Sequence, residues 1–171
     1  MRKIRMIAAA VLAAVTMTLA PMTVSAAWGL PAKTQTQTED SYVFKSGAVE
    51  IKMGEEAGAV LAQLGAPVKP VFEIDSCAYQ GKDKVYSYKD FEVSTYPKNG
   101  KECISAVVVT GASAATPEGI RIGSKAADVT KAYGASDGKY GIYRYEKGNT
   151  ELTFYTTTAG IVEEIEYIVK Q

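Results

Sequence analysis

The sequence contains no histidine among its 171 residues. Histidine is the usual general base of nucleophilic catalysis and the commonest metal ligand in proteins. Its absence excludes Ser-His-Asp and Cys-His enzymes and histidine-based zinc sites. A lysine-assisted serine is the remaining nucleophile, but the Ser-x-x-Lys spacing from Ser136 to Lys139 has the composition of a turn. The sequence therefore does not predict an enzyme.

Cysteine is almost as scarce, because the chain has only Cys77 and Cys103. In an oxidising compartment this even count predicts one disulfide, which would stabilise the fold by about 3–4 kcal/mol. Two free thiols or a two-sulfur metal pair are the alternatives, since a sequence does not show the distance between two sulfurs. The aspartates of predicted turns, Asp75, Asp83 and Asp90, lack EF-hand spacing. No metal and no cofactor are predicted.

An excess of positive charge is also lacking once the first 26 residues are set apart. Three basic residues precede a mostly apolar run over residues 6–20, and a small-x-small site ends at Ala26. This pattern predicts a cleaved signal peptide over residues 1–26, with no cysteine directly after it to carry a lipid anchor. The 19 basic residues then fall to 16, against 19 acidic ones. We expect a secreted or extracytoplasmic protein with no membrane anchor and no nucleic-acid partner.

Residues 27–40 are polar and low in complexity, which predicts a flexible leader. Regular patterning begins at Ser41, where two short apolar stretches flank the turn-type dipeptide Ser46-Gly47. This arrangement predicts a β-hairpin.

One segment of the sequence occurs twice. "IKMGEEAGAVLAQLGAP" at residues 51–67 matches "IRIGSKAADVTKAYGAS" at residues 120–136, and both copies keep an apolar spacing typical of one helical face. Each copy predicts a short amphipathic helix that ends at a glycine. Ser124 is the candidate N-cap of the second helix.

Strand-like segments separated by turn residues follow each predicted helix. "CAYQ", "KVYSYK", "FEVSTY" and "CISAVVV" follow the first, and "YGIYRYE", "ELTFYT" and "GIVEEIEYIV" follow the second. We therefore predict an α+β fold in which tandem helix-plus-β-meander repeats form one antiparallel sheet with the helices on one face. The first repeat covers residues 41–110, the connector residues 111–119 and the second repeat residues 120–171.

The tyrosines provide the candidate binding residues. Tyr86/Tyr88 and Tyr143/Tyr145 are i, i+2 pairs, so each pair shares one face of a strand. Either they pack beneath the helices as core, or they line the open face as anchors for a partner. Arg144, between two of them, favours the first interpretation, because a charged residue is rarely buried unpaired. Arg144 would then face the open side and is itself a candidate binding residue.

The turn "PKNGK" at residues 97–101 is the first candidate contact loop. It predicts a basic hairpin tip at the edge of the open face, with Tyr96, Lys98 and Lys101 as binding residues. The alternative is a turn that only keeps the protein soluble.

The spacing V-x-x-x-L-G-x-P at Val60, Leu64, Gly65 and Pro67 is similar to the helix signature of SmpA/OmlA-type envelope proteins. The tandem arrangement resembles the beta-lactamase inhibitory protein-like superfamily, which includes secreted bacterial proteins whose function is not established. The resemblance covers residues 41–169. It implies a concave antiparallel sheet that binds another protein, in some members a hydrolase whose active site it plugs.

These observations predict a secreted, non-enzymatic module that binds an extracytoplasmic or envelope protein, with inhibition of an extracytoplasmic hydrolase as the sharpest version. A binder of cell-wall glycan or a small ligand, using surface tyrosines, is the main alternative. An enzyme would need paired carboxylates, and the only dense acidic group is Glu163, Glu164 and Glu166. A solvated strand face explains that group better.

Overall fold

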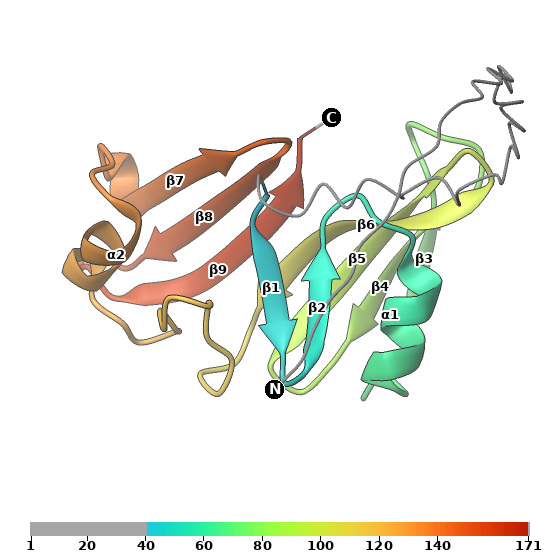
Figure 1. Ribbon diagram of the computed structural model, residues 1–171, viewed down its shortest axis with the longest axis horizontal. Helices are drawn as coiled ribbons and strands as arrows, with labels where there is room; N and C mark the ends of the chain where they lie inside the picture. Colours follow the sequence, from blue (N-terminus) through green and yellow to red (C-terminus); the bar gives the residue numbers. More distant parts are fainter. Residues whose placement is uncertain (1–40, 171) are drawn as a thin grey trace, which may run out of the picture. The chain divides into compact units, whose positions relative to one another are not determined.

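The computed structural model describes residues 41–170 of the chain. The predicted signal peptide and leader lie outside the described residues. The elements follow one another as β1 (Val43–Ser46), β2 (Val49–Lys52), α1 (Ala57–Leu64), β3 (Phe72–Asp75), β4 (Lys82–Ser87), β5 (Phe91–Lys98), β6 (Lys101–Val109), α2 (Ala126–Tyr133), the short 3-10 helix η1 (Lys139–Gly141), β7 (Ile142–Lys147), β8 (Thr150–Thr156) and β9 (Val162–Val169) (Figure 1).

A seven-stranded antiparallel sheet organises the described residues, in the order β3-β4-β5-β6-β9-β8-β7. Strands β6 and β9 are distant in the sequence and meet at the middle of the sheet. Strands β3 and β7 are its two edges. With two helices beside the sheet, the fold is of the α+β type, as predicted.

The register defines two faces of the sheet. Val93 pairs with Val107, Val107 with Tyr167, Tyr167 with Leu152, and Leu152 with Tyr145, across five neighbouring strands. Directly paired residues point to the same face. All five are buried, and Tyr145, at 8%, is the most exposed of them. We call this buried side the helix-side face and the opposite side the open face.

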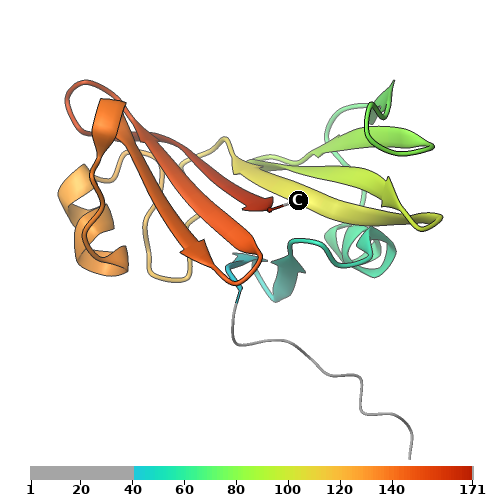
Figure 2. The same ribbon diagram turned by 90° about the horizontal axis from the view of Figure 1, so that it is seen from above.

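The hairpin β1–β2 and both helices cover the helix-side face (Figure 2). Phe44 and Ile51 of the hairpin, Val60 of α1 and Val129 of α2 belong to the same hydrophobic cluster as the buried sheet residues. The hairpin was predicted from the Ser46-Gly47 turn, and the pairing of β1 with β2 confirms it.

The helices lie where the sequence predicts them, although one cap differs. Helix α1 stops at Gly65, whose φ of 77° favours glycine, and the Gly65 N–H donates to the Leu61 carbonyl. Helix α2 is capped by Lys125, whose N–H donates to the Asp128 carboxylate. Ser124 was predicted as this cap and is not, because its hydroxyl accepts a hydrogen bond from the Arg121 N–H instead.

The first strand after α1 is also displaced from its prediction. Residues 77–80 were predicted as a strand, whereas β3 lies upstream at Phe72–Asp75 and residues 77–80 belong to the loop before β4. Within the described range, no helix is long and apolar enough to cross a membrane.

Candidate binding site on the open face

The four paired tyrosines lie on the helix-side face. Tyr145 belongs to the buried core, and Tyr86, Tyr88 and Tyr143 pack against it. The Tyr86 hydroxyl donates to Glu102 at 2.7 Å, and the Tyr88 ring stacks on Phe91 with centroids 5.0 Å apart. The first interpretation of the tyrosines is therefore confirmed. Strand alternation sends the tyrosines toward the core while Arg144 points to the open face, and a binding role for them stays a prediction.

The hairpin tip between β5 and β6 is exposed over residues 98–101. Asn99 and Gly100 form its turn with φ of 52° and 74°, the conformation that Asn-Gly favours in two-residue hairpins. Lys101 forms an ion pair with Glu56 at 2.7 Å, and this hydrogen bond raises the pKa of the Lys101 ammonium. Lys98 is exposed.

Tyr96 is buried rather than displayed. Only 5% of it is exposed, because the ring of Tyr79 packs against its ring with centroids 5.4 Å apart. It still contributes to the open face as the floor of a groove described below.

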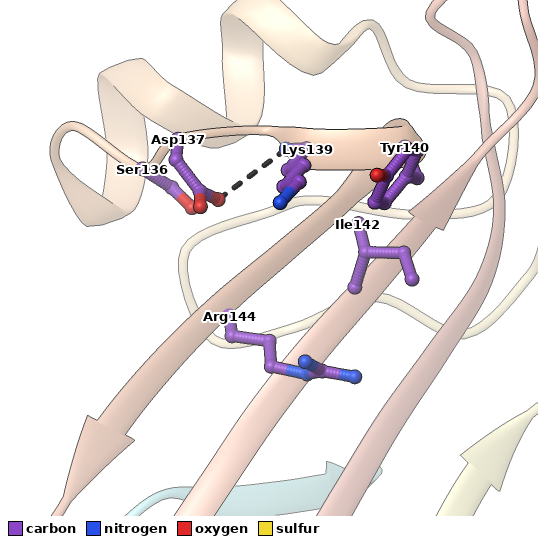
Figure 3. A pocket seen from close by; sticks show the side chains of 6 residues that line it. All are labelled: Ser136, Asp137, Lys139, Tyr140, Ile142 and Arg144. Atoms are coloured by element: carbon purple, nitrogen blue, oxygen red, sulfur yellow. Dashed lines mark hydrogen bonds between the residues drawn. The ribbon is translucent and has the colours of Figure 1, made fainter.

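Arg144 lies on the open face near the β7 edge of the sheet. It is more than half exposed and its Nε is 3.5 Å from Glu151 of β8. It lines a cavity of about 510 Å³ together with Tyr140 and Ile142, and Ser136, Asp137 and Lys139 complete the lining (Figure 3).

Tyr140 is the most exposed large hydrophobic side chain of the described residues, at 87%. Its backbone has φ 58°, which is uncommon for a bulky residue. The Lys139 ammonium lies 5.1 Å from the centroid of its ring. The β7 edge thus presents an aromatic ring with cations beside it.

A second groove lies at the opposite end of the open face, where strands β3, β4 and β5 adjoin. Phe72 pairs with Val85, Ile74 with Asp83, and Val85 with Ser94, so these side chains share one face. The groove has a volume of about 290 Å³ and is lined by Phe72, Ile74, Asp83, Lys84, Val85, Ser94, Thr95, Tyr96 and Ser105. We call it the β3 groove.

The β3 groove has an apolar rim that faces solvent. Phe72 is 60% exposed and Ile74 is 49% exposed. Both belong to an edge strand of four residues, every one of which is exposed. Exposed large apolar side chains gathered beside a groove are typical of a binding surface rather than of an inert face.

Asp83 contributes a carboxylate to this groove. Its Oδ1 atom is buried and has no hydrogen-bond partner among the residues that the structure describes. The adjacent lysines do not neutralise it, because Lys82 pairs with Glu73 at 3.4 Å and Lys84 pairs with Glu102 at 3.0 Å. Asp83 was predicted in a turn and lies in β4 instead.

Glu102 is the best-satisfied carboxylate of the fold and lies on the helix-side face. It accepts hydrogen bonds from Thr95, Tyr86 and Lys84 at 2.7, 2.7 and 3.0 Å. Burial favours its neutral form, but the three donors outweigh burial and lower the pKa of Glu102. Burial and the hydrogen bond to Glu102 raise the pKa of Tyr86 to about 12. A carboxylate held this way stabilises the fold and is a poor general base.

The acidic group on β9 is spread over the strand. Glu166 accepts a hydrogen bond from the Tyr155 hydroxyl at 3.1 Å. Burial, followed by the charges of Glu166 and Glu163, raises the pKa of Glu164. None of these carboxylates lines either of the two cavities described above.

The predicted disulfide is not present. Cys77 is a free, exposed thiol, and Cys103 is a free, buried thiol on β6. The sequence could not decide this, because it does not give the distance between two sulfurs.

Apart from Tyr96, the residues that line the β3 groove were not among the predicted binding residues. Their signal was the alternation in "FEID" at residues 72–75, where Phe72 and Ile74 share one face and Glu73 and Asp75 the other. This alternation covers only four residues, and "CAYQ" at residues 77–80 competes with it as a strand prediction.

No protein-family model and no curated protein matches the sequence. One solved structure matches in shape, the crystal structure of an extracellular protein containing a SCP domain from Bacillus anthracis str. Ames. The two chains share 16% sequence identity with a TM-score of 0.43, and the match covers 73% of this chain and 47% of that chain. This chain thus spans about half the length of that protein.

Proposed function

We propose that the chain is a secreted, non-enzymatic module that binds an extracytoplasmic or envelope protein through the open face of its sheet. The observation that carries this proposal is the β3 groove, where Phe72 and Ile74 expose 60% and 49% of their surface beside a hollow of about 290 Å³. Interfaces are anchored by large side chains that fill or border such hollows.

The position of the groove also favours a protein as the partner. Strand β3 ends the sheet, so one side of its backbone can pair with a strand from another protein. An extended segment added to a sheet edge gains backbone hydrogen bonds there and places alternate side chains in neighbouring pockets.

We further propose that residues 41–110 and 120–171 are tandem copies of one helix-plus-meander unit. Helix α1 precedes β3–β6 and α2 precedes β7–β9. The equivalent residues Val60 and Val129 are both buried. Together with the resemblance to the beta-lactamase inhibitory protein-like superfamily, this makes inhibition of an extracytoplasmic hydrolase the specific activity to test.

The placement of the paired tyrosines favours a protein partner over the tyrosine-based alternative. Glycan binding would use the paired tyrosines as exposed stacking platforms, whereas Tyr86, Tyr88, Tyr143 and Tyr145 pack on the helix side of the sheet. A protein partner therefore explains the open face better.

The test is affinity capture with the tagged protein from envelope and secreted fractions of the source cells. The wild type should retain one protein, which the double variant Phe72→Thr/Ile74→Thr should lose because threonine keeps strand propensity but removes the apolar rim. Val68→Thr is the matched control, since Val68 is 64% exposed and does not line the groove. If the captured protein is a hydrolase, its rate should fall when the wild type is added and not when the double variant is added. Failure of the wild type to retain any protein that depends on Phe72 and Ile74 would contradict the proposal.

A further inference from the structure

We infer that the β3 groove recognises a lysine or arginine side chain, presented by an apolar segment of the partner protein. This inference rests on the proposed function and adds the chemistry of the partner to it. It assigns Asp83 as the residue that pairs with the incoming cation, and Phe72 and Ile74 as the walls that hold the segment around it.

The carboxylate of Asp83 lacks a partner that a positively charged group could provide. Its Oδ1 atom is buried beside the apolar groove and accepts no hydrogen bond from any residue of the range 41–170. An ionised oxygen withdrawn from water without a partner is costly, and the cost is recovered when a cation with N–H donors reaches it. A binding partner with a basic side chain supplies that cation.

Lys84 is among the residues that line the groove, but the ammonium groups of both lysines beside Asp83 pair with other carboxylates. Alternation along β4 sends Lys82 and Lys84 to the face opposite Asp83. There they pair with Glu73, and Lys84 also pairs with Glu102. The arrangement therefore leaves the Asp83 carboxylate on the open face, while both lysine ammonium groups are paired on the opposite face.

The walls of the groove match the stem of a basic side chain rather than a bare ion. Phe72, Ile74 and Val85 provide apolar surface on which the methylene groups of lysine or arginine can lie. Ser94 and Ser105 line the same groove, and their hydroxyls can accept hydrogen bonds from the other N–H groups of the basic side chain. A metal is not indicated, because the described residues hold no group of three acidic, cysteine or histidine side chains placed to bind one.

The exposed rim, Phe72 and Ile74, determines which residues are favoured next to the basic residue in the partner segment. Phe72 and Ile74 are the side chains that a strand added along β3 would adjoin. An apolar residue next to the lysine or arginine would cover them, whereas a polar neighbour would leave them in water. The recognised segment thus combines one basic residue with apolar flanks.

The experiment is a selection of displayed random peptides on the purified wild-type protein and on Asp83→Asn. Asparagine keeps the shape of the side chain and removes its charge. Peptides selected on the wild type should be enriched in lysine or arginine beside apolar residues, and those selected on Asp83→Asn should keep the apolar residues without the basic one. Peptides from both selections should fail to bind the double variant Phe72→Thr/Ile74→Thr.

The pairing is then measured with the best selected peptide by fluorescence anisotropy. Replacement of its basic residue by norleucine should weaken binding to the wild type about tenfold or more, as for close charge pairs at interfaces. The same replacement should change binding to Asp83→Asn less than twofold. Circular dichroism of both variants, unchanged from the wild type, shows that they fold.

Three outcomes would overturn the inference or its basis, and they differ from one another. Peptides that depend on Phe72 and Ile74 but carry no basic residue would overturn the role of Asp83 and leave the proposed function standing. No peptide that depends on those two residues would argue against the proposed function itself. A dimer of the wild type that Asp83→Asn dissociates would show that a second copy, and not a partner, fills the groove.

Discussion

At the scale of single residues, Glu102 shows how the sheet uses charge inside the fold. Its carboxylate is 29% exposed and lies within hydrogen-bond distance of three donors from β4 and β5. Hydrogen bonds to an ionised group contribute more to stability than those between neutral groups. The cluster joins β6 to β4 across the intervening strand β5.

We expect Glu102→Gln to lower the free energy of unfolding by about 2 kcal/mol at pH 7, because one neutral amide oxygen replaces an ionised acceptor. The pKa of Glu102 is lowered in the folded state from 4.5. The stabilisation is therefore complete above about pH 4.5 and is lost as the pH falls through the folded-state value. Urea unfolding at about pH 7 and about pH 3 should show the difference between variant and wild type shrinking in acid.

The control for this prediction is Glu163→Gln, a carboxylate on an exposed position of β9. Its substitution should change stability by less than about 0.5 kcal/mol at both pH values. A Glu102→Gln variant with the same loss at neutral and acid pH would show that the cluster stabilises through packing and not through charge.

At the scale of secondary structure, each helix depends on the sheet for its stability. Both helices have eight residues, which is short of the length at which an isolated helix is stable in water. Val129 is completely buried, whereas Ala127 on the same helix is exposed. Helix α2 thus offers one buried and one exposed position at which aspartate can be introduced.

Val129→Asp should unfold the protein or lower its free energy of unfolding by more than about 3 kcal/mol, because it buries an unpaired charge in the core. Ala127→Asp is the matched control and should change stability by less than about 0.5 kcal/mol, since the added charge stays in water near the helix N-terminus. Thermal unfolding followed by circular dichroism measures both. A folded Val129→Asp variant of unchanged melting temperature would contradict the packing of α2 on the sheet.

The elements with strong periodicity were predictable from the sequence, and most residues of the proposed binding groove were not. Val60 and Val129 follow the helical spacing, so both helices were found. Arg144 between two tyrosines correctly indicated which face of β7 is buried. Strand β3 was missed, because it has four residues and only two of them are apolar. The unpaired state of Asp83 depends on where Lys82 and Lys84 point, and that requires the register of three strands.

At the scale of the whole molecule, one hydrophobic core serves both ends of the sheet. Tyr167 of β9 pairs with Val107 of β6 on one side and Leu152 of β8 on the other. Its ring also packs against Phe44 of the hairpin, with centroids 5.6 Å apart. Residues 41–110 and residues 120–171 therefore share side-chain contacts, even if they arose as two copies of one unit.

A shared core predicts a single cooperative unfolding transition. Ile104→Ala on β6 and Leu152→Ala on β8 each remove a fully buried side chain, which costs about 3 kcal/mol. Both should shift the same transition by about 10 °C, and near- and far-ultraviolet circular dichroism should give the same midpoint. Val68→Ala, at an exposed position, should leave it unchanged.

If each substitution moved a different transition, the two ends would fold independently, and the β3 groove would be a property of residues 41–110 alone. Coincident shifts would mean that a change at β8 also weakens the groove, because the core that supports β5 and β6 is the core that holds β8.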